Sequence, residues 1–236
     1  MGLFDKKFCD FCGGKIGLLG NRKLSDGNMC KECAAKISPY LVGRKEYSVD
    51  EMKEHLAYRE ENKERLSAFN ATRTLGVATR VHIDEDHGLF VITASQKYKD
   101  GNPDVMELTQ ITGCNLDIDE KKTEEKRKNA EGKEESYVPA RYKFEYDFNI
   151  TVNVNHRWFD QIRFKVNSKN IEGRTSIDYK DTDRQANDII VALQGVYQDT
   201  REAAKPKTAV TCPSCGASTL PDMNGCCEYC GAPVGA

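Results

Sequence analysis

The sequence predicts an α+β fold in which a small antiparallel β-domain is closed by a C-terminal helix and flanked by a cysteine-rich module at each end. Three observations carry this prediction. Residues 141–154 alternate strictly between apolar and polar side chains, which is the period of a strand with one buried face. Residues 182–201 place apolar side chains at helical spacing. Two pairs of cysteines precede these segments, and two pairs follow them.

Length and composition allow one to three domains. The chain has 236 residues, of which 39% are hydrophobic and 31% are charged. Only its middle part is rich enough in β-branched and aromatic residues for a sizeable core. The formal net charge is −2, which is a weak basis for sequence-independent nucleic-acid binding, because that needs a basic surface.

Ten cysteines would suit a secreted disulfide protein, but the first residues have neither an apolar core nor a cleavage site of a secretion signal. No segment approaches the ~20 apolar residues of a membrane span. We therefore expect a cytoplasmic protein. In that reducing compartment, paired cysteines indicate metal or redox chemistry.

Residues 1–47 are predicted to form a treble-clef-like zinc finger. Two C-x-x-C pairs are separated by seventeen residues, a spacing typical of a four-thiolate zinc site. The second pair runs into a helix-favouring stretch, so its cysteines are expected at a helix N-terminus. A redox-active pair is the alternative, but such motifs lie singly within βαβ units, and none is predicted here. The predicted ligands are Cys9, Cys12, Cys30 and Cys33.

Residues 212–236 are predicted to form a zinc ribbon, which a linker over residues 204–211 joins to the rest. Two C-x-x-C pairs are separated by eleven residues, and each pair is followed by glycine. So short a module needs a metal staple, because it cannot bury enough surface alone. Cys226 could replace Cys227 as a ligand, although the glycine after Cys230 favours Cys227. The predicted ligands are Cys212, Cys215, Cys227 and Cys230.

Both Zn²⁺ ions are expected to be structural. Four protein thiolates complete a tetrahedral shell and leave no position at which a metal-bound water could be activated.

Residues 48–70 are predicted to form a charged linker helix. Ser48 and Glu51 have the spacing of a capping box, in which each side chain satisfies a free backbone amide. Apolar positions are sparse along this segment, so we expect a solvated spacer with one thin packed stripe. A partner-binding coiled coil is the less favoured alternative.

Residues 71–203 are predicted to form the β-domain. Alternation from Gly76 predicts a hairpin with its turn at residues 85–88, and residues 162–166 read as a later strand. Residues 121–136 contain no apolar side chain larger than alanine, which favours a solvated, mobile loop. Thr182 and Gln185 have capping-box spacing at the start of the final helix. Strands closed by one helix are the layout of a small pleckstrin-homology (PH) or GRAM-type domain, an analogy that gives no function.

No catalytic centre can be assembled from the motifs, so an enzyme is not expected. The four histidines lie outside metalloprotease motifs, and phosphate-binding loops and nucleophile elbows are absent from the sequence. Cys114 reads as a small core residue. One loop offers large aromatic residues beside charge, which makes Arg157, Trp158 and Phe159 candidate partner-binding residues. Packing against the edge of the β-domain is the favoured alternative for them.

Several motifs resemble an uncharacterised family of Gram-positive bacteria and their phages, whose domains have no known function. They are CDFCGGKIGL, KLSDGNMCKEC, EMKEHLAYREENKERL, NPDV, QITGCNLDI and VNHRWFDQIRFKV. The resemblance covers most of the chain, and the C-terminal ribbon is a common addition. It implies that Cys9, Cys12, Cys30 and Cys33 are ligands, and it implies no activity.

The sequence favours a zinc-binding adaptor that recognises an unidentified protein partner. Nucleic-acid binding through the fingers is the first alternative, because residues 1–47 hold nine basic and five acidic residues. Lipid binding by the β-domain is the second. It would need a basic rim, which only residues 121–133 could supply, diluted by glutamates, so a membrane partner is not expected.

Overall fold

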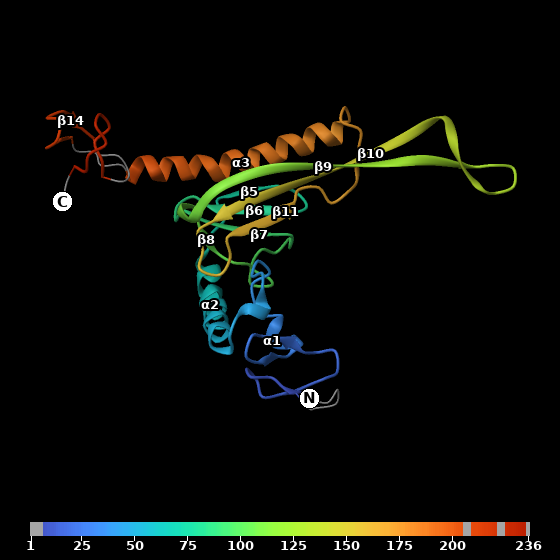
Figure 1. The fold of residues 1–236 in the computed structure, drawn as a ribbon, viewed down its shortest axis with the longest axis horizontal. Coiled ribbons are helices and arrows are strands. Elements are labelled where there is room, and N and C mark those ends of the chain that lie inside the picture. Colours follow the sequence, from blue (N-terminus) through green and yellow to red (C-terminus); the bar gives the residue numbers. More distant parts are fainter. Residues whose placement is uncertain (1–6, 205–208, 221–224, 235–236) are drawn as a thin grey trace.

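The computed structural model describes residues 7–204, 209–220 and 225–234. It is an α+β structure with small antiparallel sheets. The N-terminal finger and helix α2 lie on one side of the sheets, and the long helix α3 lies on the other (Figure 1). A two-stranded arm projects from one end of the sheets, and the C-terminal ribbon follows α3 at the opposite end (Figure 1).

The N-terminal finger consists of two short hairpins and one turn of helix. The predicted helix start is confirmed: Cys30 is the N-cap of α1, and its sulfur accepts the backbone N–H of Cys33. A short 3-10 helix, η1, leads from the finger to α2. The elements are β1 (Lys7–Phe8) paired with β2 (Lys15–Ile16), β3 (Arg22–Lys23) paired with β4 (Asn28–Met29), α1 (Lys31–Ala34) and η1 (Arg44–Glu46).

Helix α2 (Val49–Ala68) begins as predicted, with the Ser48–Glu51 capping box formed in both directions. The single packed stripe expected for this charged helix is present, but its character differs from the expectation. Five side chains of α2 are buried, and three of them are polar or charged. Their spacing of three and four residues puts them on one face, so a polar stripe packs where an apolar one is usual. The buried residues are Met52, His55, Arg59, Asn62 and Leu66.

The first sheet is a four-stranded antiparallel meander. Its central hairpin is the predicted one: Asp84 pairs with Leu89, so residues 85–88 form the turn. Both faces of its central strands are covered: Phe90 and Ile92 pack in the main core, whereas Val91 packs in a second cluster with Leu66 and Phe69. The 3-10 helix η2 (Leu108–Gln110) leads on to the second sheet. The strands are β5 (Arg73–Leu75), β6 (Arg80–Asp84), β7 (Leu89–Thr93) and β8 (Met106–Glu107).

The second sheet is built around the strand with strict alternation. The prediction is confirmed over its C-terminal half, where every second side chain from Tyr146 to Val154 is buried. In that stretch Ile150 pairs with Leu116 on one side and with Phe164 on the other. The strands are β9 (Ile111–Lys128), β10 (Glu134–Val154), β11 (Gln161–Lys165) and β12 (Ile171–Glu172).

The solvated loop predicted over residues 121–136 is instead the far part of the β9–β10 hairpin, the arm in Figure 1. Its side chains are mostly exposed, as expected for so polar a segment. The two strands nevertheless continue through this segment, because backbone hydrogen bonds between paired strands need no apolar face. Without a buried face, residues 121–128 carry no alternating pattern from which a strand could be recognised.

Helix α3 (Ile177–Ala204) begins five residues before the predicted capping box at Thr182. The true cap is Ser176, whose hydroxyl accepts the backbone N–H of Tyr179. The predicted apolar stripe is confirmed as far as Leu193, since Ala186, Ile189 and Leu193 are buried in the core shared by both sheets, whereas the side chains of its last members, Val196 and Tyr197, lie outside the described residues. The order of antiparallel strands followed by one helix agrees with the predicted order, and the likeness to PH domains stays a prediction.

The C-terminal ribbon has a small core of its own. Strand β13 (Val210–Thr211) pairs with β14 (Ser218–Thr219), and Cys212, Cys227 and Val234 form a buried cluster separate from that of the sheets.

Candidate metal centres

The four cysteines of the finger converge as predicted. Their four Sγ atoms all lie within 4.8 Å of one another, and those of Cys12 and Cys30 are 3.8 Å apart. With zinc–sulfur bonds of ~2.3 Å, the edge of a regular tetrahedron is ~3.8 Å. A disulfide would instead need ~2.05 Å. The donors therefore fit a tetrahedral Zn²⁺ ion held by Cys9, Cys12, Cys30 and Cys33.

Backbone amides prepare this site for a cation. The N–H of Cys30 donates to the Sγ of Cys9 over 3.3 Å, and the N–H of Cys33 donates to the Sγ of Cys30 over 3.4 Å. Burial acts to raise the pKa of Cys9, but hydrogen bonds from the backbone N–H groups of Cys30, Phe11 and Cys12 outweigh it and lower that pKa to about 6. The Cys9 thiolate, the form that binds zinc, is thus favoured at neutral pH, whereas burial and the neighbouring cysteines raise the pKa of Cys33.

The ribbon holds a second cluster of the same kind. The Sγ atoms are 3.6 Å apart for Cys212 and Cys230, and 3.7 Å apart for Cys215 and Cys227. Burial opposes ionisation of Cys227 too, but the backbone N–H groups of Tyr229 and Cys230 lower its pKa to about 6. These distances also match the edge of a zinc tetrahedron.

The two knuckles of the ribbon have the same backbone geometry. In each, the glycine after the second cysteine donates its N–H to the carbonyl of the first: Gly216 to Cys212 over 2.9 Å and Gly231 to Cys227 over 2.8 Å. Both glycines have a φ near +70°, which a residue with a Cβ adopts only under strain. Of the two adjacent cysteines that could be the third ligand, Cys227 is the one whose sulfur joins the cluster. Cys226 instead forms a backbone bridge with Pro233.

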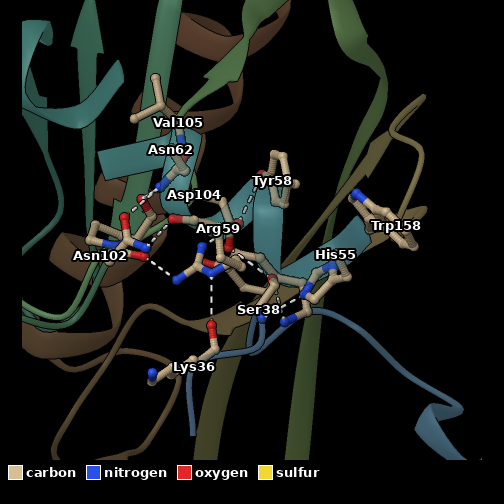
Figure 2. Close-up of polar contacts among 12 residues, drawn as sticks. Lys36, Ser38, His55, Tyr58, Arg59, Asn62, Asn102, Asp104, Val105 and Trp158 are labelled. Atoms are coloured by element: carbon tan, nitrogen blue, oxygen red, sulfur yellow. Dashed lines mark hydrogen bonds and ion pairs between the residues drawn. The ribbon is translucent and has the colours of Figure 1, made fainter. Parts of the chain in front are cut away.

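A buried polar network, which no sequence motif indicates, joins the finger and α2 to the sheets. Its centre is Asp104, in the loop before β8 (Figure 2). The carboxylate accepts hydrogen bonds from Ser38 Oγ at 2.8 Å and Tyr58 OH at 2.9 Å, and it forms an ion pair with Arg59 at 2.5 Å. Arg59 Nε also donates to the carbonyl of Lys36 over 3.2 Å. The finger, the helix and the first sheet thus share one buried charge pair.

Two asparagines extend the network along α2. Asn62 donates through Nδ2 to the carbonyl of Pro103 and accepts the N–H of Val105 through Oδ1, both over 2.8 Å. Asn102 donates to the carbonyl of Arg59 over 2.9 Å. The loop of residues 102–105 is therefore fixed to the helix by side-chain to backbone bonds, as Figure 2 shows.

His55 belongs to the same junction. Its Nε2 accepts the backbone N–H of Ser38 over 3.0 Å, while its buried Nδ1 has no hydrogen-bond partner among the described residues. Burial lowers the pKa of His55 to about 4, more than the nearby Asp104 carboxylate raises it. The imidazole is therefore neutral at physiological pH. Sequence alone marks His55 only as a lone histidine on a charged helix.

The candidate partner-binding residues lie mostly inside the molecule, which corrects that prediction. Trp158 is 6% exposed and Phe159 is 5% exposed. The indole packs edge-on against His55 with ring centroids 4.8 Å apart, and Phe159 stacks on His156 at 4.1 Å. Arg157 is exposed and pairs with Glu54 of α2. These contacts fit the favoured alternative of internal packing, in which Trp158 packs against α2.

The remaining candidate residues form no further centre within the described part of the chain. Cys114 is buried on β9, and burial raises its pKa to about 11, so its thiol is inert. His87 contacts Asp84 through Nδ1 at 2.9 Å, and His82 contacts Thr74 at 2.9 Å. No cluster of metal-binding side chains other than the two cysteine sets is found among the described residues.

Comparisons with known proteins leave the geometry as the main guide to function. None of the helices in the described part of the chain combines the length and apolar character needed to cross a membrane. A search of curated proteins and a search of solved structures both give no match. Residues 7–55, which contain the finger and the first turns of α2, match the family model of a domain of unknown function (DUF4428).

Proposed function

We propose that this chain is a non-enzymatic, cytoplasmic zinc-binding adaptor that works by recognising another protein. Both cysteine clusters supply four thiolates, the donor set of structural zinc sites. The Asp104 network fixes the finger to the sheets through buried contacts. These features favour a rigid body that displays surfaces over one that carries out chemistry.

The observation that carries the proposal is a bulge on the β9–β10 arm. Ser136 pairs with Lys126, and Arg141 pairs with the adjacent Glu125, so residues 137–140 have no partner on β9. This bulge places Tyr137, Val138, Pro139 and Ala140 among charged neighbours, with Val138 96% exposed. An apolar and aromatic patch far out on a polar arm is a candidate recognition site.

The side chains around the bulge are held in place before any partner binds. The guanidinium of Arg141 lies 4.5 Å from the Tyr137 ring centroid, and that of Arg127 lies 5.6 Å from it. Arg127 also forms an ion pair with Glu135 at 2.8 Å. Tyrosine and arginine are enriched at binding hot spots, and a preordered tyrosine loses less entropy on binding.

A protein fits this arm better than a nucleic acid does. Residues 120–142 contain seven basic and six acidic side chains, so the arm is almost neutral. Phosphate backbones require a clear excess of positive charge. The outer edges of the arm carry many charges, which discourages indiscriminate strand pairing and leaves the bulge as the specific feature.

Site-specific photocross-linking tests the proposal. A benzophenone amino acid would replace Val138 in the full chain, expressed in its native cells. The control carries the same group at Val191, which is 67% exposed on α3. We expect one protein to be cross-linked at position 138 and not at 191, with a product that resists nuclease. The Tyr137→Ala substitution should reduce the yield at least fivefold.

A shortened arm provides a second control. Glu124 and Tyr142 are paired residues, so replacing residues 125–141 by Asn-Gly closes the hairpin at a lower register. This variant should keep both zinc ions and lose capture of the partner. Cross-linking to nucleic acid at position 138, or equal cross-linking at positions 138 and 191, would contradict the adaptor proposal.

A further inference from the structure

A second exposed apolar feature lies at the tip of a finger loop. Residues 17–20 form a tight turn, in which the N–H of Gly20 donates to the carbonyl of Gly17 over 3.0 Å. The two central residues are Leu18, 85% exposed, and Leu19, 89% exposed. Adjacent leucines so fully exposed are costly to hydrate, and a turn displays them on a convex point rather than in a groove.

The turn is anchored on both sides. It joins β2 to β3, and Ile16, directly before the turn, and Leu24, directly after β3, are buried in the main core. The guanidinium of Arg22 donates through Nη1 to the carbonyl of Leu19 over 3.3 Å. The finger itself is fixed to the sheets by the Asp104 network, and it lies on the side of the molecule away from α3 (Figure 1). The leucines therefore need no reordering to insert into a partner surface.

Positive charge surrounds this tip. Residues 7–25 contain four basic side chains, at Lys7, Lys15, Arg22 and Lys23, and one acidic side chain, Asp10. The Asp10 carboxylate keeps its charge and accepts the backbone N–H of Asn28 over 2.6 Å. Four basic side chains and one acidic side chain give this stretch +3, which exceeds the −2 of a zinc ion held by four thiolates. A pair of leucines flanked by cations combines insertion into hydrocarbon with attraction to anionic headgroups.

We propose that the tip formed by Leu18 and Leu19 is a peripheral anchor for an anionic lipid surface. The leucines enter the interfacial layer while Lys15, Arg22 and Lys23 contact phosphate-bearing headgroups. A fluid bilayer accepts a convex apolar point, whereas a protein partner would need a matching pocket. This site differs from the lipid site considered from the sequence, which lay on the β-domain. It is independent of the arm.

The structure sets the size of the expected effects. Removing one inserted leucine should weaken binding about tenfold or more, and removing one cation near the surface should weaken it about fivefold. Two leucines and a few cations give weak, reversible binding, so the salt concentration and the anionic lipid content should both control it.

Vesicle co-sedimentation of the full, zinc-loaded chain tests the inference. The probes are vesicles of phosphatidylcholine alone and vesicles with roughly a third phosphatidylglycerol, both in ~0.1 M salt. We expect binding to the anionic vesicles only. A Leu18→Ser/Leu19→Ser variant should bind at least ~100-fold more weakly, and Lys15→Glu/Lys23→Glu should abolish the preference for anionic lipid.

Matched controls separate this inference from loss of folding and from the adaptor proposal. Val42→Ser removes an exposed apolar side chain elsewhere in the finger and should leave binding unchanged. The shortened arm should bind vesicles like the wild type. All variants should retain two zinc ions. No binding by the wild type, unchanged binding of the leucine variant, or loss of protein capture in that variant would overturn the proposal.

Discussion

Replacing Asp104 by asparagine should destabilise the junction between the finger and the sheets. The carboxylate is fully buried and accepts from Ser38, Tyr58 and Arg59. Asparagine has nearly the same shape but no charge, and the buried Arg59 guanidinium then loses its counter-charge. Breaking a buried pair by removing one partner costs about 3–5 kcal/mol. Since asparagine keeps one acceptor oxygen, we expect the lower end, about 3 kcal/mol.

Urea denaturation followed by tryptophan fluorescence measures this loss directly. The chain has a single tryptophan, Trp158, which packs on His55 at the junction. With a denaturant slope of roughly 2 kcal/mol per M, the midpoint should fall by about 1.5 M. Glu60→Gln is the control, because it breaks an exposed pair with Lys63 on the same helix and should cost less than about 1 kcal/mol. A loss for Asp104→Asn no larger than that of the control would show that the buried pair with Arg59 does not stabilise the junction.

Three further predictions concern the metal centres and the junction. Cys12→Ser and Cys215→Ser should each reduce the zinc content from two ions to one, whereas Cys226→Ser should keep both, as measured by elemental analysis. Removing residues 211–236 should shift the fluorescence-detected unfolding midpoint little, because the ribbon buries its own core; a large shift would mean that the ribbon docks on the sheets. His55 has a folded pKa of about 4 and an ordinary value of 6.5. The unfolded chain therefore binds more protons in that window, and stability should fall as the pH drops from 6.5 to 4, by at most about 1.4 kcal/mol per pH unit from this group. His55→Gln should show a shallower decline, and equal slopes for the two proteins would contradict this assignment.

The features that can be predicted from the sequence are those determined by residues close together in the chain. Cysteine spacing identified both four-cysteine clusters, because two knuckles at a short separation have few uses other than metal binding. The Ser48–Glu51 box fixed the start of α2, and alternation identified the buried half of β10. In each case the residues that determine the structure are neighbours in the chain, so the pattern is visible without the fold.

The features that were missed depend on partners distant in the chain. Asp104 contacts Ser38 across 66 residues, and no pattern at either position indicates the pair. The arm was missed for a different reason, since its strands have no buried face to produce alternation. Internal packing was the favoured expectation for Trp158, but no local pattern indicates that α2 is the element that covers it.

X-ray absorption at the zinc edge of the intact chain tests most directly whether each cysteine cluster is a closed structural site, which would leave the molecule to act as a scaffold for recognition. We expect two zinc ions per chain, each with four sulfur neighbours at ~2.3 Å and no oxygen or nitrogen neighbour. A light-atom ligand at either zinc would reveal an open position where chemistry could occur, and it would contradict the assignment of the protein as a non-catalytic adaptor.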